Sequence, residues 1–202
     1  MSIILVRHGE TAGNAPRVLQ SPDVPLNERG IRQARQLAER LRAFDIAHVL
    51  CSDFVRTRMT AEPIRAQLPD ARYEESTLLR ERDFGDLRGR PYAELEGDPF
   101  APDFVPPNGE SWPAFYERVA KAFALIAARR QGLTGDLLVV THGLVCGVLL
   151  HRHLHMADFA APPGFQNTSV TIFDPAPPHR VRTLNCTLHL SSEAAGRDGG
   201  AA

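Results

Sequence analysis

Residues 3–9 read Ile-Ile-Leu-Val-Arg-His-Gly, a short apolar run with a polar corner directly after it. An uninterrupted apolar run of this length is typical of a strand whose two faces are both covered. The arrangement recurs where residues 48–51 run into Ser52 and where residues 137–141 run into His142. Ligands bind at the carboxyl ends of parallel strands. We therefore expect His8, Ser52 and His142 to converge at one edge of a sheet.

Amphipathic helices are predicted between these strands. Residues 28–42 carry apolar side chains at helical spacing after Asn27, a good N-cap, and residues 111–130 repeat the pattern with Ser111 as the N-cap. Ser52 and Asp53 are expected to cap a further helix ending near residue 67, and residues 144–150 suit a buried helix. Two more strands are predicted over 169–173 and 181–186. This alternation predicts an α/β fold, a three-layer α/β/α sandwich with a mostly parallel central sheet.

Two segments depart from this regular pattern. Between residues 77 and 110 the periodicity fades and glycines and prolines interrupt the chain, which predicts a short cap excursion over the active site. Residues 191–202 are rich in Gly and Ala without apolar periodicity, which predicts a disordered tail. Residues 1–190 are thus expected to form one domain.

Composition limits the classes of partner. The chain has 202 residues with a formal net charge of −1, so no basic excess favours nucleic acid or an anionic membrane as a partner. Three widely spaced cysteines form no C-x-x-C pair, which favours free thiols. The first apolar run reaches Arg7 after four residues, too short for a signal peptide or a spanning helix. A cytoplasmic location is expected, and the sequence carries no signal for an oligomeric state.

Arg7 and His8 suit phosphoryl transfer on chemical grounds. A neutral imidazole is nucleophilic near pH 7, so His8 can attack phosphorus without an added base. Phosphoryl transfer also needs positive groups around three equatorial oxygens, and the planar fork of arginine binds them bidentately.

Several ordered motifs resemble the histidine phosphatase superfamily, which includes the cofactor-dependent phosphoglycerate mutases. The likeness spans roughly residues 3–173. It rests on residues 7–11 (Arg-His-Gly-Glu-Thr) with Asn14, 25–30 (Pro-Leu-Asn-Glu-Arg-Gly), 52–56 (Ser-Asp-Phe-Val-Arg), 79–81 (Leu-Arg-Glu), 140–143 (Val-Thr-His-Gly) and 167–170 (Asn-Thr-Ser-Val).

The resemblance implies a histidine acid-type phosphatase, a phosphoric monoester hydrolase acting on a small phosphorylated metabolite. His8 is then the residue that becomes phosphohistidine, and Glu81 is the proton donor to the leaving alcohol. The predicted phosphate-binding residues are Arg7, Asn14, Gln20, Arg56 and His142. No cofactor is expected, and no metal, because no carboxylate cluster with ligand spacing is apparent.

Two alternatives to a phosphatase remain open. A phosphoglycerate mutase is disfavoured because the chain lacks an evident longer excursion with paired arginines. A phosphate-binding module without turnover is disfavoured by the presence of the catalytic residues His8, His142 and Glu81.

Two residues bear on substrate preference because they depart from the family pattern. Arg88 stands where many relatives have glutamate and Ser21 where relatives often have glycine, which leaves the substrate preference open. Five aromatic residues are expected to line a pocket for an apolar or aromatic alcohol: Phe84, Tyr92, Phe100, Phe104 and Trp112.

Overall fold

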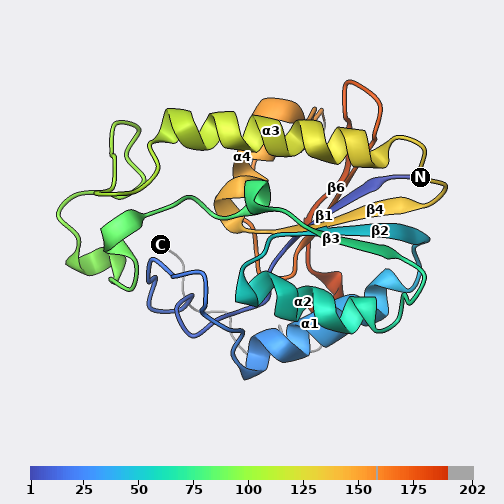
Figure 1. The fold of residues 1–202 in the computed structure, drawn as a ribbon, viewed down its shortest axis with the longest axis horizontal. Coiled ribbons are helices and arrows are strands. Elements are labelled where there is room, and N and C mark those ends of the chain that lie inside the picture. Colours follow the sequence, from blue (N-terminus) through green and yellow to red (C-terminus); the bar gives the residue numbers. More distant parts are fainter. Residues whose placement is uncertain (158, 191–202) are drawn as a thin grey trace.

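A computed structural model of the chain describes residues 1–157 and 159–190, and Figure 1 shows its fold. The tail predicted over 191–202 lies outside the described residues. A six-stranded sheet has the order β3-β2-β4-β1-β5-β6. The neighbouring strands among β1, β2, β3 and β4 pair in parallel, whereas β5 pairs antiparallel with both β1 and β6. The strands are β1 (Ile3–Arg7), β2 (Ile46–Cys51), β3 (Arg72–Glu75), β4 (Asp136–Thr141), β5 (Val170–Phe173) and β6 (Val181–Cys186).

Helices cover both faces of this sheet, which confirms the predicted α/β/α fold. α1 (Glu28–Leu41) and α2 (Val55–Arg65) lie on one face, and α3 (Trp112–Arg130) and α4 (Gly143–His153) lie on the other (Figure 1). The apolar core is correspondingly divided into two clusters. Successive residues of β1 alternate between them, because side chains along a strand point to opposite faces. The unbroken apolar run of β1 therefore supplies both halves of the core.

Helix caps follow the sequence pattern in two cases and depart from it in one. The Asn27 side chain accepts a hydrogen bond from the Gly30 amide at 2.7 Å, and the Ser111 hydroxyl accepts one from Ala114 at 3.3 Å. The expectation that Ser52 and Asp53 cap α2 is wrong, since Phe54 holds that position without a side-chain cap. Their side chains have other partners: the Ser52 hydroxyl contacts His142, and the Asp53 carboxylate pairs with Arg80.

The predicted cap excursion crosses the carboxyl edge of the sheet as an extended segment with short 3-10 turns. These turns are η1 (Thr77–Leu79), η2 (Gly85–Leu87) and η3 (Tyr92–Glu94), and a further turn, η4 (Leu188–Leu190), follows β6. The cap pairs with the loop after β1 through an isolated bridge between Val18 and Pro91. The Leu19 amide also donates to the Arg90 carbonyl at 3.0 Å. Two segments far apart in sequence therefore form one wall.

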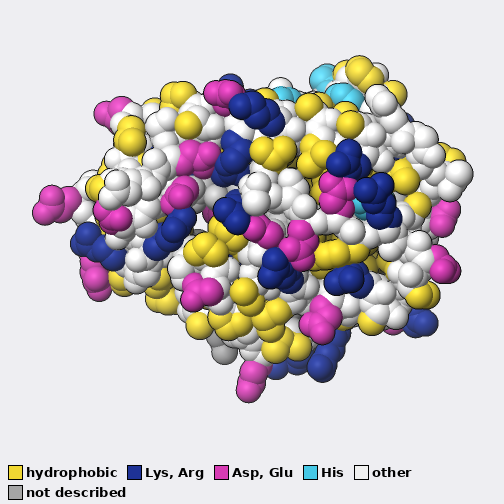
Figure 2. Space-filling model, viewed as in Figure 1, with side chains coloured by type: hydrophobic (Ala, Val, Ile, Leu, Met, Phe, Trp, Pro, Cys, Tyr) yellow, Lys and Arg dark blue, Asp and Glu magenta, His cyan; other side chains and the backbone are white. Residues whose placement is uncertain are grey.

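The surface shown in Figure 2 mixes basic and acidic side chains without a broad field of one sign. Within residues 1–157 and 159–190, no helix is both long enough and apolar enough to cross a membrane.

Candidate active site

Three polar residues meet where the three adjacent strands β1, β4 and β2 end. The His8 amide donates to the Thr141 carbonyl and the Ser52 amide to the Val140 carbonyl, each at 2.9 Å, so both turns are fixed to β4. The ring centroids of His8 and His142 are 5.2 Å apart, and His142 Nε2 lies 2.9 Å from Ser52 Oγ. The expected convergence of these residues is confirmed.

The hydrogen bond of His8 determines which ring nitrogen is free. Nδ1 lies 2.7 Å from the carbonyl oxygen of Gly9. A carbonyl only accepts, so Nδ1 carries the proton and Nε2 keeps its lone pair. Burial, assisted by the charges of Arg56 and Arg7, holds the pKa of His8 well below its usual value. The imidazole is therefore neutral at pH 7 with Nε2 available as a nucleophile.

His142 has a complementary arrangement. Its Nε2 faces the Ser52 hydroxyl, whereas its Nδ1 is buried without a hydrogen-bond partner among the described residues. Burial and the charge of Arg56 lower its pKa well below the usual value. Phe54 packs edge-on at 5.1 Å between ring centroids and restricts rotation of the imidazole. A neutral His142 can donate only one hydrogen bond, and Ser52 can determine from which nitrogen.

Two guanidinium groups flank these histidines. Arg7 donates to the Phe165 carbonyl, and Arg56 donates to the Ser21 carbonyl at 2.9 Å. Neither has a carboxylate ion-pair partner within the part of the chain that the structure describes, and both Nε atoms are buried without an acceptor. Burial lowers the pKa of Arg56 to about 10, so it stays charged at neutral pH. Charged groups with this little access to water and no ion-pair partner are suited to binding an anion, which would offset the cost of their burial.

Asn14 and Gln20 present their amides from the loop after β1. The carbonyl Oδ1 of Asn14 accepts from the Thr11 amide at 2.8 Å and lies 3.0 Å from the Thr11 hydroxyl. The Thr11 hydroxyl also lies 2.8 Å from Gln20 Oε1. With both amide oxygens directed to Thr11, the NH2 groups are left to donate elsewhere, as an anion site requires.

Glu81 is the carboxyl group of the site. Its Oε2 accepts a hydrogen bond from the Leu144 amide at 3.1 Å, at the start of α4. Burial raises its pKa above the usual value, although the Leu144 amide and the charge of Arg56 oppose this shift. A carboxyl with a raised pKa is suited to donating a proton near neutral pH.

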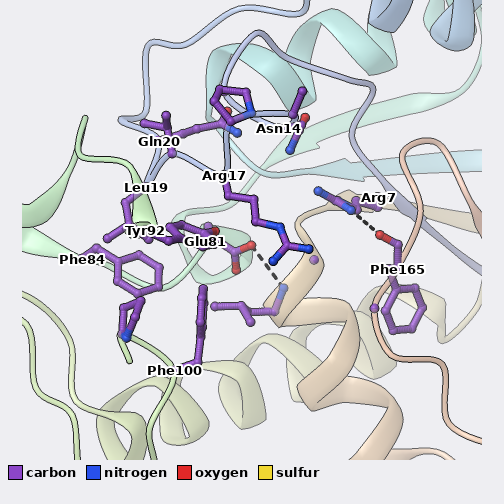
Figure 3. Close-up of a pocket in the computed structure, with 18 of the residues that line it drawn as sticks. Arg7, Asn14, Arg17, Leu19, Gln20, Glu81, Phe84, Tyr92, Phe100 and Phe165 are labelled. Carbon is purple, nitrogen blue, oxygen red and sulfur yellow. Dashed lines mark hydrogen bonds between the residues drawn. The ribbon is translucent and has the colours of Figure 1, made fainter. Parts of the chain in front are cut away.

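A cavity of about 960 Å³ joins these groups. Six of the predicted site residues line it: Arg7, His8, Asn14, Gln20, Arg56 and Glu81. His142 is fully buried and is not among the lining residues, although its ring packs against that of His8, which is one of them. Phe84, Tyr92 and Phe100 form an aromatic wall, with centroid separations of 5.9 Å for Phe84 to Phe100 and 5.1 Å for Tyr92 to Phe100 (Figure 3).

Two of the aromatic residues expected in the pocket are not among its lining residues. Trp112 stacks against Arg82 at 4.1 Å, and Phe104 accepts a hydrogen bond from Arg82 through its carbonyl. These residues hold the cap rather than facing the cavity. The two departures from the family pattern also lie outside the lining: Arg88 pairs with Asp83 on the cap, and the Ser21 side chain contacts Asp23.

Arg17 and Thr11 were not predicted as site residues, although Thr11 ends the motif over residues 7–11. Arg17 lines the cavity and points into it (Figure 3), and Thr11 orients the two amides. Both lie in an irregular loop, where no periodicity indicates which side chains turn inward. No group of three or more His, Cys, Asp or Glu side chains among the described residues is arranged to hold a metal ion.

Comparisons with known proteins show the family of the chain and proteins with a similar fold. A family model described as the histidine phosphatase superfamily (branch 1) matches residues 3–187. A phosphoglycerate mutase-like protein of Arabidopsis thaliana is 36% identical over 183 residues, covering 85% of this chain and 78% of the relative. A probable phosphatase of Schizosaccharomyces pombe is 31% identical over 210 aligned residues, covering 98% and 99%. A solved structure of a putative α-ribazole-5′-P phosphatase from Escherichia coli has a TM-score of 0.76 and 26% identity, covering 92% of this chain and 96% of that one.

Proposed function

Because the chain belongs to branch 1 of the histidine phosphatase superfamily, we propose that it is a phosphomonoesterase acting on a small phosphorylated metabolite through His8. One observation carries this proposal. A neutral imidazole with a free Nε2 lies in the same cavity as the guanidinium groups of the buried Arg56 and the partly buried Arg7, which lack a carboxylate ion-pair partner among the described residues. This combination provides a nucleophile and the charge that a phosphoryl group needs.

In the proposed first step, Nε2 of His8 attacks phosphorus and forms a P–N bond while the bond from phosphorus to the ester oxygen breaks. Glu81 transfers its proton to the departing oxygen, so that a neutral alcohol leaves. Arg7, Arg56, the Asn14 and Gln20 amides and Nδ1–H of His142 bind the phosphoryl oxygens. The Gly9 carbonyl stabilises the positive charge that develops on the His8 ring.

In the second step, water attacks phosphorus and the P–N bond breaks. The carboxylate of Glu81 accepts a proton from that water, which restores the carboxyl group for the next cycle. The electron pair of the P–N bond returns to Nε2 of His8, and inorganic phosphate is released. The reaction requires no oxidant, reductant or metal, and we propose that it proceeds without one.

Hydrolysis is favoured over mutase activity by the mouth of the cavity. The lining contains Arg7, Arg17 and Arg56, and Arg17 is exposed. A mutase must keep its phosphohistidine from water while the intermediate reorients. A mouth with one exposed arginine suits access of water, and the Schizosaccharomyces pombe relative carries a phosphatase name.

The aromatic wall favours a phosphate ester whose alcohol portion has a planar or apolar body. The Escherichia coli structure, named a putative α-ribazole-5′-P phosphatase, makes a nucleoside-like ester one example of this class. The proposed location is the cytoplasm, since the three cysteines are free thiols.

Release of phosphate from p-nitrophenyl phosphate in EDTA tests the proposed reaction. We expect wild-type turnover to survive chelation and His8→Ala to lose at least about a thousandfold of kcat, because the nucleophile is absent. His151→Ala, at an exposed position of α4, is the matched control. Equal activity of wild type and His8→Ala would disprove the phosphohistidine route.

The alternative of a phosphate-binding module has its own outcome. It predicts no turnover of any ester by the wild type but a rise in melting temperature with inorganic phosphate, since binding to the folded state stabilises it. The rise should disappear in Arg56→Met.

A further inference from the structure

Arg17 is the cation of the cavity that the proposed reaction does not use. Arg17 is exposed, whereas Arg56 is buried and Arg7 is partly buried, and the charges of these two act on His8. Figure 3 shows its guanidinium pointing into the cavity, on the side where Glu81 lies. Its charge lowers the pKa of the nearby Tyr92 phenol, against the larger effect of burial, which raises it. Arg17 is therefore close to the aromatic wall.

The backbone holds Arg17 in this direction at a cost. Its φ of 52° is in the left-handed region, which residues other than Gly, Asn and Asp seldom adopt. The Tyr92 amide donates to the Arg17 carbonyl at 2.9 Å, and Val18 bridges Pro91, so the cap fixes this turn. An ordinary surface arginine needs no such conformation, and strain of this kind is concentrated at binding sites.

The Arg17 guanidinium makes no hydrogen bond or ion pair with residues 1–157 or 159–190. The arginines of the neighbouring cap do have partners there: Arg82 donates to three carbonyls, and Arg88 pairs with Asp83. A free guanidinium facing an aromatic wall can bind an anion on a planar body that rests on the wall.

We propose that Arg17 determines substrate specificity by binding a second anionic group, carried by the alcohol portion of the phosphate ester. The inner site then binds the phosphoryl group, the aromatic wall contacts the body of the alcohol, and Arg17 pairs with its carboxylate or second phosphate. This inference rests on the proposed phosphomonoesterase function. It narrows the substrate class to esters with two anionic ends separated by an apolar or planar body.

A pair of synthetic esters that differ in one charge tests the inference. 4-Carboxyphenyl phosphate carries a second anion, and 4-carbamoylphenyl phosphate is its neutral equivalent of nearly the same shape. We expect wild-type kcat/KM to favour the carboxylate over the carboxamide by about tenfold or more, the value of one charge-assisted pair. In Arg17→Asn, which removes the charge yet tolerates the left-handed backbone, the ratio of the two kcat/KM values should fall by about tenfold from that of the wild type. Comparing the ratio between proteins cancels the difference in leaving-group chemistry.

Two further variants test whether the charge at residue 17 causes the preference for the carboxylate ester. Arg17→Lys keeps the charge and should retain part of the preference. Arg58→Gln removes an arginine that pairs with Glu75 outside the cavity and should leave the ratio unchanged. An Arg17→Asn enzyme with the wild-type ratio would overturn the inference, as would a wild type without a preference for the carboxylate.

Failure of the proposed function is distinguishable from failure of this inference. Binding of the two esters to His8→Ala, measured by calorimetry, does not depend on turnover. Tighter binding of the carboxylate ester, lost when Arg17→Asn is added, would support the inference even if the wild type hydrolysed neither ester. Equal binding of both esters would reject it.

Discussion

At the scale of single residues, burial shifts the pKa values of Glu81 and His8 in opposite directions, and each shift suits the proposed role of the group. Burial disfavours the charged form of each, so it raises the pKa of the carboxyl and lowers that of the imidazole. One acid and one nucleophile are thereby ready at the same pH. The neighbouring arginines favour the ionised carboxylate and oppose the shift of Glu81, so the shift reflects the lack of water around it.

Replacing Glu81 should affect poor leaving groups most. Glu81→Gln cannot donate a proton, so we expect kcat to fall about 10² to 10⁴-fold for an alkyl phosphate such as glycerol 3-phosphate. The loss should be much smaller for p-nitrophenyl phosphate, whose phenolate leaves without a proton. Steady-state kinetics of both esters check this, and equal losses would assign Glu81 a different role. In the wild type, kcat for the alkyl ester should decline as the pH rises through the raised pKa of Glu81.

Ser52 should position His142. The Phe54 amide lies 3.5 Å from the Ser52 oxygen as a weak donor, so the Ser52 hydroxyl proton is free to reach Nε2 of His142. That hydrogen bond leaves the ring proton on Nδ1, the atom without a partner among the described residues. Ser52→Ala should lower kcat about tenfold to a hundredfold with little change in KM.

Nitrogen NMR of the imidazole separates positioning by Ser52 from a general loss of structure. In the wild type the proton of His142 should reside on Nδ1, and in Ser52→Ala it should be shared between the two nitrogens. A drop in kcat without any change of tautomer would contradict the positioning role.

At the scale of elements, the cap is held by one buried arginine. Arg82, 3% exposed, donates to the carbonyls of Glu110, Pro99 and Phe104 at 2.9, 3.1 and 2.7 Å. It stacks on Trp112 at 4.1 Å. The apolar and proline-rich cap therefore depends on a polar anchor that its own composition does not reveal.

Arg82→Met should release the cap. Three carbonyls, all buried or partly buried, would lose their donor, so we expect the free energy of unfolding to fall by about 2–4 kcal/mol. KM for a bulky aryl phosphate should rise, because Phe100 would no longer be held against the cavity. Hydrogen exchange over residues 98–110 should accelerate more than exchange in β1. Arg90→Met removes a cap arginine that, among the described residues, donates only to the Glu94 carbonyl, and it serves as the control. Similar exchange in both variants would refute the anchor.

Regular elements were predictable where their periodicity was strong. β1, α1 and α3 follow their apolar patterns because each must bury one face or both. β3 was missed because it is a polar strand of four residues at the edge of the described sheet, where it pairs with β2 alone. The capping role expected for Ser52 and Asp53 was wrong because contacts with His142 and Arg80, distant in sequence, use those side chains. Local chemistry alone does not show which of two available partners a polar residue takes.

At the scale of the whole molecule, the sheet order explains why the site residues were easier to predict than their partners. β2, β4 and β1 are neighbours, so corners that are 44 and 90 residues apart in the chain, His8 to Ser52 and Ser52 to His142, meet at one edge. The sequence pattern of alternating strands and helices predicts that this edge forms. It does not predict that Arg17 points into the cavity, because that direction depends on the bridge between Val18 and Pro91.

The same burial makes the stability of the molecule depend on pH. His8 and His142 are both held neutral, with pKa values well below 6.5, whereas they titrate near that value in the unfolded chain. Below about pH 6.5 the unfolded state binds protons that the folded state does not, so the free energy of unfolding falls as the pH decreases. The maximum slope is roughly 1.4 kcal/mol per pH unit for each histidine. Glu81 acts in the opposite direction, because its raised pKa removes stability as the pH rises above the unfolded value.

Denaturant unfolding between pH 4.5 and 7.5 measures this dependence. We expect the free energy of unfolding of the wild type to fall steadily below pH 6.5. In His142→Gln its slope against pH should be shallower, because about one proton fewer is taken up on unfolding. Buried His48, whose pKa is also lowered by burial, contributes equally to both proteins and cancels in the comparison. Exposed His151→Gln should leave the slope unchanged. Inorganic phosphate should stabilise the wild type and reduce its slope, because a bound dianion favours protonated histidine. A slope that is the same in wild type and His142→Gln would mean that His142 is charged in the folded protein, which would exclude its proposed role as a neutral donor directed by Ser52.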